Sequence, residues 1–251
     1  MGLNAALART GVVLLLPTAI LSAGAPASPR TQLATARQLV VVTTPDWNSV
    51  DGTLRRYDRA AVTDPWTAVG PPVPIVVGRA GMAWDASWRD PKVVTGPVKA
   101  EGDGRSPAGV FTLTRAFGYD PAPSASRMLY TQAIDALECV DDPRSRYYNQ
   151  LVDRRAAQPD WTSAEQMHRP DDLYRLGVVV DYNVQPAVPG HGSCIFLHIW
   201  DGPGRGTAGC TAMTAPEMAQ AVDWLQPDAH PVLVQFPQPV FDRLRGTWRL
   251  P

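Results

Sequence analysis

The strongest strand patterns in the chain are Gly177-Val-Val-Val-Asp-Tyr-Asn183 and Cys194-Ile-Phe-Leu-His-Ile199. Both are short, rich in β-branched and aromatic residues, and bounded by turn-forming residues, which is typical of β-strands. The Pro/Gly-rich segment 185–192 lies between them. Because such a segment favours a reversal of the chain, we predict that the two strands form a hairpin.

Further strand patterns lie on both sides of this hairpin. They cover residues 38–42, 52–58, 66–69, 74–77, 110–114, 127–131 and 231–236. The 251 residues include 25 prolines and 20 glycines, which favours many turns and argues against a helical bundle. The chain is therefore expected to be mainly β, with a few short helices.

The helix signals are few. Asp142-Pro143 resembles an N-cap followed by a first-turn proline and predicts a helix through about Asp153. Thr162–Glu165 and Thr214–Glu217 both fit capping boxes. Apolar residues at helical spacing follow the second box, which predicts a helix that ends at Pro227. The residues beyond 237 are expected to form an irregular tail.

The N-terminus has the pattern of an export signal. Arg9 precedes an apolar run, Gly11–Leu21, and Ala25-Pro26-Ala27 fits a cleavage site. We predict a signal peptide over residues 1–27 and one domain over 28–251, secreted to the periplasm or the cell wall. An uncleaved membrane anchor is the alternative. No later run is apolar and long enough to cross a bilayer, so no stable membrane span is expected after cleavage.

Charge and motif content restrict the function further. The net charge of −1 lacks the basic excess of a dedicated nucleic-acid binder, so no nucleic-acid partner is expected. The four histidines and three cysteines form no recognised metal-ligand spacing, so no metal site is expected. In an oxidising compartment two of the three cysteines could pair and leave one free thiol.

A histidine and a cysteine form the candidate catalytic pair. His198 lies near the end of a predicted strand, and Cys210 lies twelve residues later (210 − 198) on a Gly-rich loop before the predicted helix. A thiol is a good nucleophile only as a thiolate, which a nearby imidazolium or helix N-terminus stabilises. Backbone N–H groups around Gly209 and Cys210 could form an oxyanion hole. The alternative is a buried apolar cysteine with a hydrogen-bonded histidine.

These residues resemble the L,D-transpeptidase (YkuD-type) catalytic domain family. His198 matches the first histidine of the family's motif, and Thr207-Ala208-Gly209-Cys210 matches its cysteine segment. Upstream, residues 102–111 resemble the family's Gly-x-x-(Thr/Ser)-Pro-x-Gly-x-Phe segment. The resemblance covers roughly residues 73–236 and implies a β-sandwich without a cofactor.

The resemblance also implies an activity. It implies cysteine acyl transfer on peptidoglycan stem peptides through a thioester, in cell-wall cross-linking or remodelling. Cys210 would be the nucleophile, His198 the general base, and the backbone of Gly209 and Cys210 the oxyanion hole. The same site could serve an L,D-carboxypeptidase or hydrolase that uses water as the acceptor. A non-catalytic wall-binding module is the third alternative.

The sequence departs from the family pattern at two places. Ala208 stands where a second histidine is usual, and Thr211-Ala212-Met213 replaces an apolar residue followed by Arg or Asn. These departures put substrate binding and turnover in doubt. We expect Thr207, with Arg205 or Arg105 as a cation for a carboxylate, to contribute to substrate binding. Solvated surface arginines are the alternative.

The remaining cysteines suit a structural role. A Cys139–Cys194 disulfide would tie an insertion to the catalytic sheet across 55 residues (194 − 139) and would stabilise the fold by on the order of 4 kcal/mol. The alternative is two buried free thiols. We expect the mature protein to be a monomer.

Overall fold

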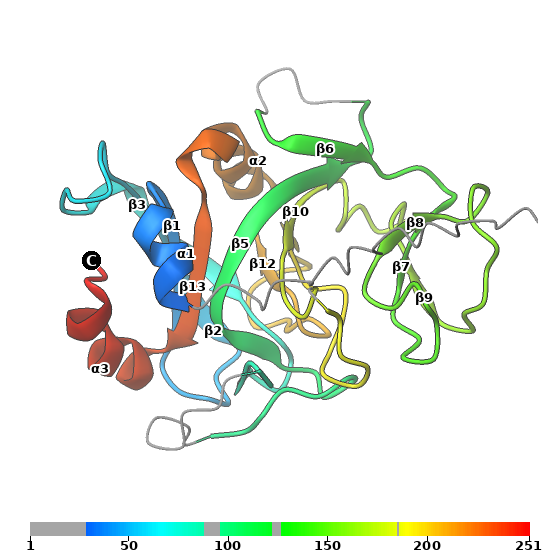
Figure 1. Ribbon diagram of the computed structural model, residues 1–251, viewed down its shortest axis with the longest axis horizontal. Coiled ribbons are helices and arrows are strands. Elements are labelled where there is room, and N and C mark those ends of the chain that lie inside the picture. The colour runs from blue at the N-terminus through cyan, green and yellow to red at the C-terminus, as the bar shows by residue number, and fades with distance from the viewer. Residues whose placement is uncertain (1–28, 88–95, 122–126, 185) are drawn as a thin grey trace, which may run out of the picture.

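The computed structural model describes residues 29–87, 96–121, 127–184 and 186–251. Within these ranges strands predominate, and the prediction of a mainly β chain with few helices is confirmed (Figure 1). The helices are Pro29–Thr35 (α1), Ala215–Trp224 (α2) and Gln238–Trp248 (α3), with a 3-10 turn at Pro227–Ala229 (η1). The strands are Gln38–Thr44 (β1), Asp51–Asp58 (β2), Thr67–Val76 (β3), Met82–Trp84 (β4), Ser106–Gly118 (β5), Leu129–Gln132 (β6), Leu137–Val140 (β7), Leu151–Asp153 (β8), Ala164–Gln166 (β9), Leu176–Val180 (β10), Phe196–Ile199 (β11), Thr211–Met213 (β12) and Val232–Pro237 (β13).

The main sheet closes on itself. Its strands follow the order β10-β11-β12-β3-β2-β1-β13-β5-β4, and β10 also pairs with β5. Figure 1 shows the long, curved β5 running through the middle of the molecule, and β5 pairs with β13 along one part and with β10 along another. The hydrogen bonds therefore join these strands into one continuous sheet. The β-sandwich implied by the resemblance stays a prediction.

The core strands follow from their sequences. β1 and β13 are runs of β-branched and apolar residues, they pair in parallel, and both are almost entirely buried. Such runs suit strands that are covered on both faces. Helix α3 packs against this pair of strands, while α2 packs against β10 and β11. The hairpin expected from the two opening stretches is formed by the antiparallel strands β10 and β11.

One predicted helix is confirmed. The Thr214 side chain accepts a hydrogen bond from the Glu217 N–H over 3.3 Å and caps α2. Met218, Ala221 and Val222 of α2 are buried against the sheet, as their helical spacing predicted. This helix covers the sheet next to the strands that carry the candidate catalytic pair.

The other helix predictions are wrong. Residues 142–150 form turns that lead into β8, because the Asp142 carboxylate accepts hydrogen bonds from Thr162 and Arg144 and draws the chain into a loop. Thr162–Glu165 leads into β9, which pairs with β7. The tail expected to be irregular forms α3, because Val240 and Phe241 find an apolar surface in the core.

A second, three-stranded sheet with the order β8-β7-β9 stands beside the main one. Cys139 of β7 forms a disulfide with Cys194, directly before β11. The pairing expected from the sequence is thus formed, and it ties the small sheet to the strand that carries His198.

The predicted signal peptide at residues 1–27 lies outside the described residues. Among the helices of the described ranges, none has the length and apolar character needed to cross a membrane.

Candidate active site

A cavity of about 480 Å³ brings the two candidate catalytic residues together. Cys210 lines it and lies between Gly209 and β12, and His198 lies on the neighbouring strand β11. The parallel pairing of β11 with β12 places His198 opposite Ala212, two residues beyond Cys210. Adjacent parallel strands thus bring into one cavity two residues that are twelve positions apart in the sequence.

The Cys210 thiol is held by backbone groups at the start of β11 and just before it. Its sulfur accepts a hydrogen bond from the Phe196 N–H at 3.3 Å, and its S–H donates to the Cys194 carbonyl at 3.5 Å. Cys210 is 4% exposed and is the free cysteine of the described residues. These contacts fix the sulfur at the end of the strand that carries His198.

The hydrogen bond at the His198 ring defines its tautomer. Nδ1 lies 2.7 Å from the Ile199 carbonyl oxygen, which only accepts, so Nδ1 carries the proton. Nε2 is therefore the basic nitrogen of the neutral imidazole. The edge of the Tyr174 ring packs against the imidazole with 5.0 Å between ring centroids and limits rotation of the ring.

The electrostatics of the unliganded cavity favour a neutral pair. Burial raises the pKa of the Cys210 thiol well above its usual range. Burial also lowers the pKa of His198 to about 4. The sequence-based expectation of a thiolate stabilised by an imidazolium at rest is therefore not met. The sulfur would lose its proton to Nε2 as it attacks, which is general base catalysis.

The expected help from a helix N-terminus is also missing. α2 begins only at Ala215, and β12 lies between Cys210 and the first turn of this helix. The influence of a helix dipole is confined to its first turn. Stabilisation of a thiolate must therefore come from side chains and backbone groups of the cavity.

The loop before Cys210 is held by hydroxyl groups. Thr207 Oγ1 donates to the Cys210 carbonyl at 2.6 Å and accepts the Gly209 N–H at 3.0 Å. Ser106 Oγ donates to the same carbonyl at 3.0 Å. A side chain at Gly209 would crowd the Arg105 carbonyl, which a Cβ would approach to 3.1 Å. The loop conformation therefore depends on glycine and on two hydroxyl donors.

These contacts change the expected roles of Gly209 and Thr207. The Gly209 N–H, predicted as an oxyanion donor, is already bonded to Thr207. The Cys210 N–H makes no hydrogen bond within the described ranges and is the better candidate donor. The Thr207 hydroxyl, predicted to bind substrate, is used to shape the loop, although the residue does line the cavity.

The two arginines predicted as carboxylate ligands differ in position. The Arg105 guanidinium donates to the carbonyls of Trp47 and Met82 and to Asn48 Oδ1, each at 3.0 Å. These bonds hold together segments next to the cavity, and Arg105 is not among the residues that line it. Its substrate role therefore stays a prediction, beside a structural role that the contacts support. Arg205 lines the cavity, but its guanidinium pairs with Asp201 at 2.8 Å.

Several cavity residues were missed from the sequence. They are Arg79, Lys99, Glu101, Asp141, Glu165, Arg169 and Tyr174. In the sequence, Glu165 fits a capping box, and Tyr174 lies outside the strand pattern that begins at Gly177. No sequence spacing links these residues to Cys210, because they come from separate loops and from the small sheet.

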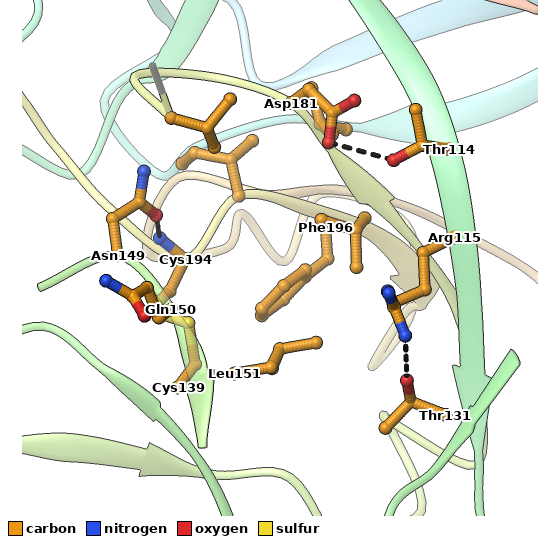
Figure 2. A pocket seen from close by; sticks show the side chains of 14 residues that line it. Thr114, Arg115, Thr131, Cys139, Asn149, Gln150, Leu151, Asp181, Cys194 and Phe196 are labelled. Atoms are coloured by element: carbon orange, nitrogen blue, oxygen red, sulfur yellow. Dashed lines mark hydrogen bonds between the residues drawn. A yellow bond between two sulfur atoms is a disulfide. The ribbon is translucent and has the colours of Figure 1, made fainter. Parts of the chain in front are cut away.

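A second cavity of about 370 Å³ lies beside the disulfide, and Figure 2 shows its side chains. Its polar groups pair with one another: Arg115 donates to Thr131 at 2.7 Å, and Asp181 accepts from Thr114 at 3.1 Å. Both cysteines that line it are bonded in the disulfide. The arrangement suited to nucleophilic chemistry is therefore the one around Cys210.

Comparison with known families agrees with this geometry. A family model of the L,D-transpeptidase catalytic domain (YkuD) matches residues 74–234, which is well over half of the chain. The chain belongs to this family, and the resemblance seen in the sequence is confirmed. Comparisons with curated proteins and with solved structures gave no significant match. Membership supports an L,D-transpeptidase type of function on peptidoglycan.

Proposed function

We propose that this protein is a cysteine acyltransferase that acts on peptidoglycan stem peptides as an L,D-transpeptidase. The observation that carries the proposal is the shared cavity of Cys210 and His198 in a chain of this family. A cysteine nucleophile with an imidazole base is the pair that acyl transfer requires.

The acylation half-reaction follows from the tautomer. Nε2 of His198 takes the thiol proton as the Cys210 sulfur attacks the carbonyl carbon of the third stem residue. The Cys210 N–H then stabilises the oxyanion by donating a hydrogen bond to it. The bond to the terminal D-Ala breaks, its nitrogen receives the proton from Nε2, and a thioester remains on Cys210.

The second half-reaction frees the enzyme. An amine of another stem peptide attacks the thioester carbonyl and passes its proton to Nε2 of His198. The carbon–sulfur bond then breaks, the sulfur regains a proton from the imidazolium, and a new amide joins the two stems. Water in place of the amine would give hydrolysis at the same site.

We also propose that the protein is exported. The N-terminal pattern at residues 1–27 supports this, and so does the Cys139–Cys194 disulfide, because structural disulfides are typical of oxidising compartments. Localisation of a tagged full-length chain in cell fractions, with N-terminal sequencing of the secreted form, tests the proposal. A chain recovered from the cytosol with an intact N-terminus would contradict it.

Incubation of the mature protein with tetrapeptide muropeptides, followed by mass spectrometry, tests the activity. Cross-linked dimers that have lost one D-Ala support the transpeptidase. Trimmed monomers support the hydrolase instead. Cys210→Ala should abolish both products, and Ser163→Ala, at an exposed site outside the cavity, serves as the matched control. Unchanged substrate with the folded wild-type protein contradicts the proposed activity.

A further inference from the structure

Tyr174 and Glu165 form a pair in the wall of the active-site cavity. The Tyr174 hydroxyl donates a hydrogen bond to Glu165 Oε2 at 2.6 Å. Tyr174 is 5% exposed, and its ring is fixed against His198. Glu165 comes from β9 of the small sheet and lines the same cavity. The acyl-transfer scheme above makes no use of either side chain.

Tyr174 also lies near the nucleophile, because Tyr174 and Cys210 belong to one buried cluster and line the same cavity. A hydrogen bond from the Tyr174 hydroxyl to the sulfur would lower the pKa of the Cys210 thiol, whereas the charge of Glu165 raises it. A tyrosine hydroxyl has a single proton to donate. It therefore serves either the Glu165 carboxylate or the Cys210 sulfur at one time.

We propose that Tyr174 is a further catalytic residue, which donates a hydrogen bond to the Cys210 sulfur once that sulfur becomes anionic, and that Glu165 is the residue that positions its hydroxyl. With Glu165 protonated, the carboxyl group donates to the Tyr174 oxygen and the hydroxyl proton is free for the sulfur. With Glu165 ionised, the hydroxyl turns to the carboxylate. The proposal rests on the proposed function only in taking Cys210 as the nucleophile.

The neighbouring residues support this assignment. Ala208, next to the Gly209–Cys210 segment, has no hydrogen-bonding side chain. The Lys99 ammonium is held by Asp103 at 2.6 Å and by the Ala100 carbonyl at 2.7 Å. Glu165, Tyr174 and Lys99 are the polar side chains whose interactions affect the pKa of the sulfur. Of these, the Tyr174 hydroxyl is the donor that can bond either the Glu165 carboxylate or the sulfur.

The surroundings of Glu165 allow both its protonated and its ionised form near neutral pH. Removal from water raises the pKa of Glu165 to about 7, and the hydrogen bond from Tyr174 opposes this rise. The charged groups that face it are Asp141, Arg169 and Glu101, in addition to the Cys210 thiol. Below the pKa of Glu165 the sulfur gains a donor and loses a repelling charge, so the thiolate is favoured there.

The rate of alkylation of Cys210 by iodoacetamide, measured from pH 5 to 10, tests the proposal on the disulfide-intact protein. The variants are Tyr174→Phe, Glu165→Gln and the double variant. Glu165→Gln keeps a donor for the Tyr174 oxygen but carries no charge, so it should speed alkylation at pH 8. It should also remove the change in alkylation rate near pH 7 that the ionisation of Glu165 causes in the wild type. Adding Tyr174→Phe to Glu165→Gln should slow alkylation roughly tenfold, the effect of one hydrogen bond to a charged atom.

Tyr148→Phe is the matched control. Tyr148 also donates to a glutamate, Glu101, at 2.5 Å, but Tyr148 does not line the active-site cavity. This variant should leave the alkylation profile unchanged. Thermal unfolding of each variant verifies that it is folded, which the retained aromatic ring favours.

Two outcomes would overturn the proposal. One is that Tyr174→Phe leaves the alkylation profile unchanged both in the wild type and in the Glu165→Gln variant. The other is an equal shift caused by Tyr148→Phe. Alkylation reads the thiol directly, so a wild-type protein that fails to turn over muropeptides would contradict the proposed function without altering this result.

Discussion

Ser106 and Cys210 are joined by a hydrogen bond from the Ser106 hydroxyl to the Cys210 carbonyl, over 3.0 Å and across 104 positions of the chain. The same hydroxyl accepts the Gly78 N–H at 2.9 Å. The start of β5 and the segment after β3 thus hold the backbone of the nucleophile. This contact explains why the motif at residues 102–111 matters for the site, because the hydroxyl of its serine, Ser106, holds the loop that carries Cys210.

Ser106→Ala should weaken both the fold and the site. Ser106 is fully buried, and its loss leaves the Gly78 N–H without a partner. We expect unfolding by urea to require about 1–3 kcal/mol less free energy. Alkylation of Cys210 should also change in rate, since its loop is loosened. Ser163→Ala, at an exposed serine, should alter neither measurement. A stability equal to that of the wild type would contradict this role.

Arg105→Lys distinguishes a structural arginine from a substrate ligand. Lysine keeps the positive charge but cannot replace the three hydrogen bonds of the guanidinium. We expect a loss of about 2 kcal/mol in the free energy of unfolding and an unchanged KM for the stem peptide. Urea denaturation and steady-state kinetics measure the two effects. A raised KM without loss of stability would restore the sequence-based assignment.

Arg79 is expected to be the stronger cation for a substrate carboxylate. It is exposed, lines the cavity, and makes no ion pair within the described part of the chain. Arg205 is partly neutralised by Asp201. Arg79→Gln should therefore raise the KM of the donor peptide more than Arg205→Gln does. Arg55→Gln, at an exposed arginine outside the cavity lining, is the control. The opposite order of KM values would contradict the prediction.

In the pH profile of kcat/KM, the fall in activity on the acid side should occur well below the ordinary pKa of histidine. Burial lowers the pKa of His198 to about 4, so its imidazole stays neutral, and basic, at any pH above that value. As the pH falls through the folded pKa, the base is protonated and kcat/KM declines. The pH profile of kcat/KM for the free enzyme measures this. A limb near pH 6.5 that persists in Glu165→Gln would contradict it.

The disulfide should contribute to stability independently of the chemistry. Cys139 and Cys194 are 55 positions apart, so their linkage restricts a long segment of the unfolded chain. Replacing both by serine should cost about 2–4 kcal/mol, measured by urea denaturation without reductant. Non-reducing peptide mapping should recover the 139–194 pair with Cys210 alkylated. A linked peptide that contains Cys210 would refute the pairing.

Prediction from the sequence succeeded where local pattern and core burial agree. The strands β1, β10, β11 and β13 were located because apolar, β-branched runs form buried strands wherever they pair. The helix predicted from Asp142 does not form, because the Asp142 carboxylate accepts a hydrogen bond from Thr162, twenty positions away. Local sequence patterns do not predict such a distant contact. The helix after Pro237 was missed because its burial depends on the core surface that meets it.

For the site, the chemistry that is available follows from the sequence: a cysteine on a Gly-rich loop and a histidine at the end of a strand, in an order and context typical of one family. That this cysteine is the free one follows from the disulfide in the structure. Only the tertiary structure decided which groups surround them. Tyr174 and Glu165 reach the cavity from separate elements, and burial makes the resting thiol and imidazole neutral. The physical reason is that hydrogen-bond partners and desolvation depend on what packs around a group in space, which its neighbours along the chain do not specify.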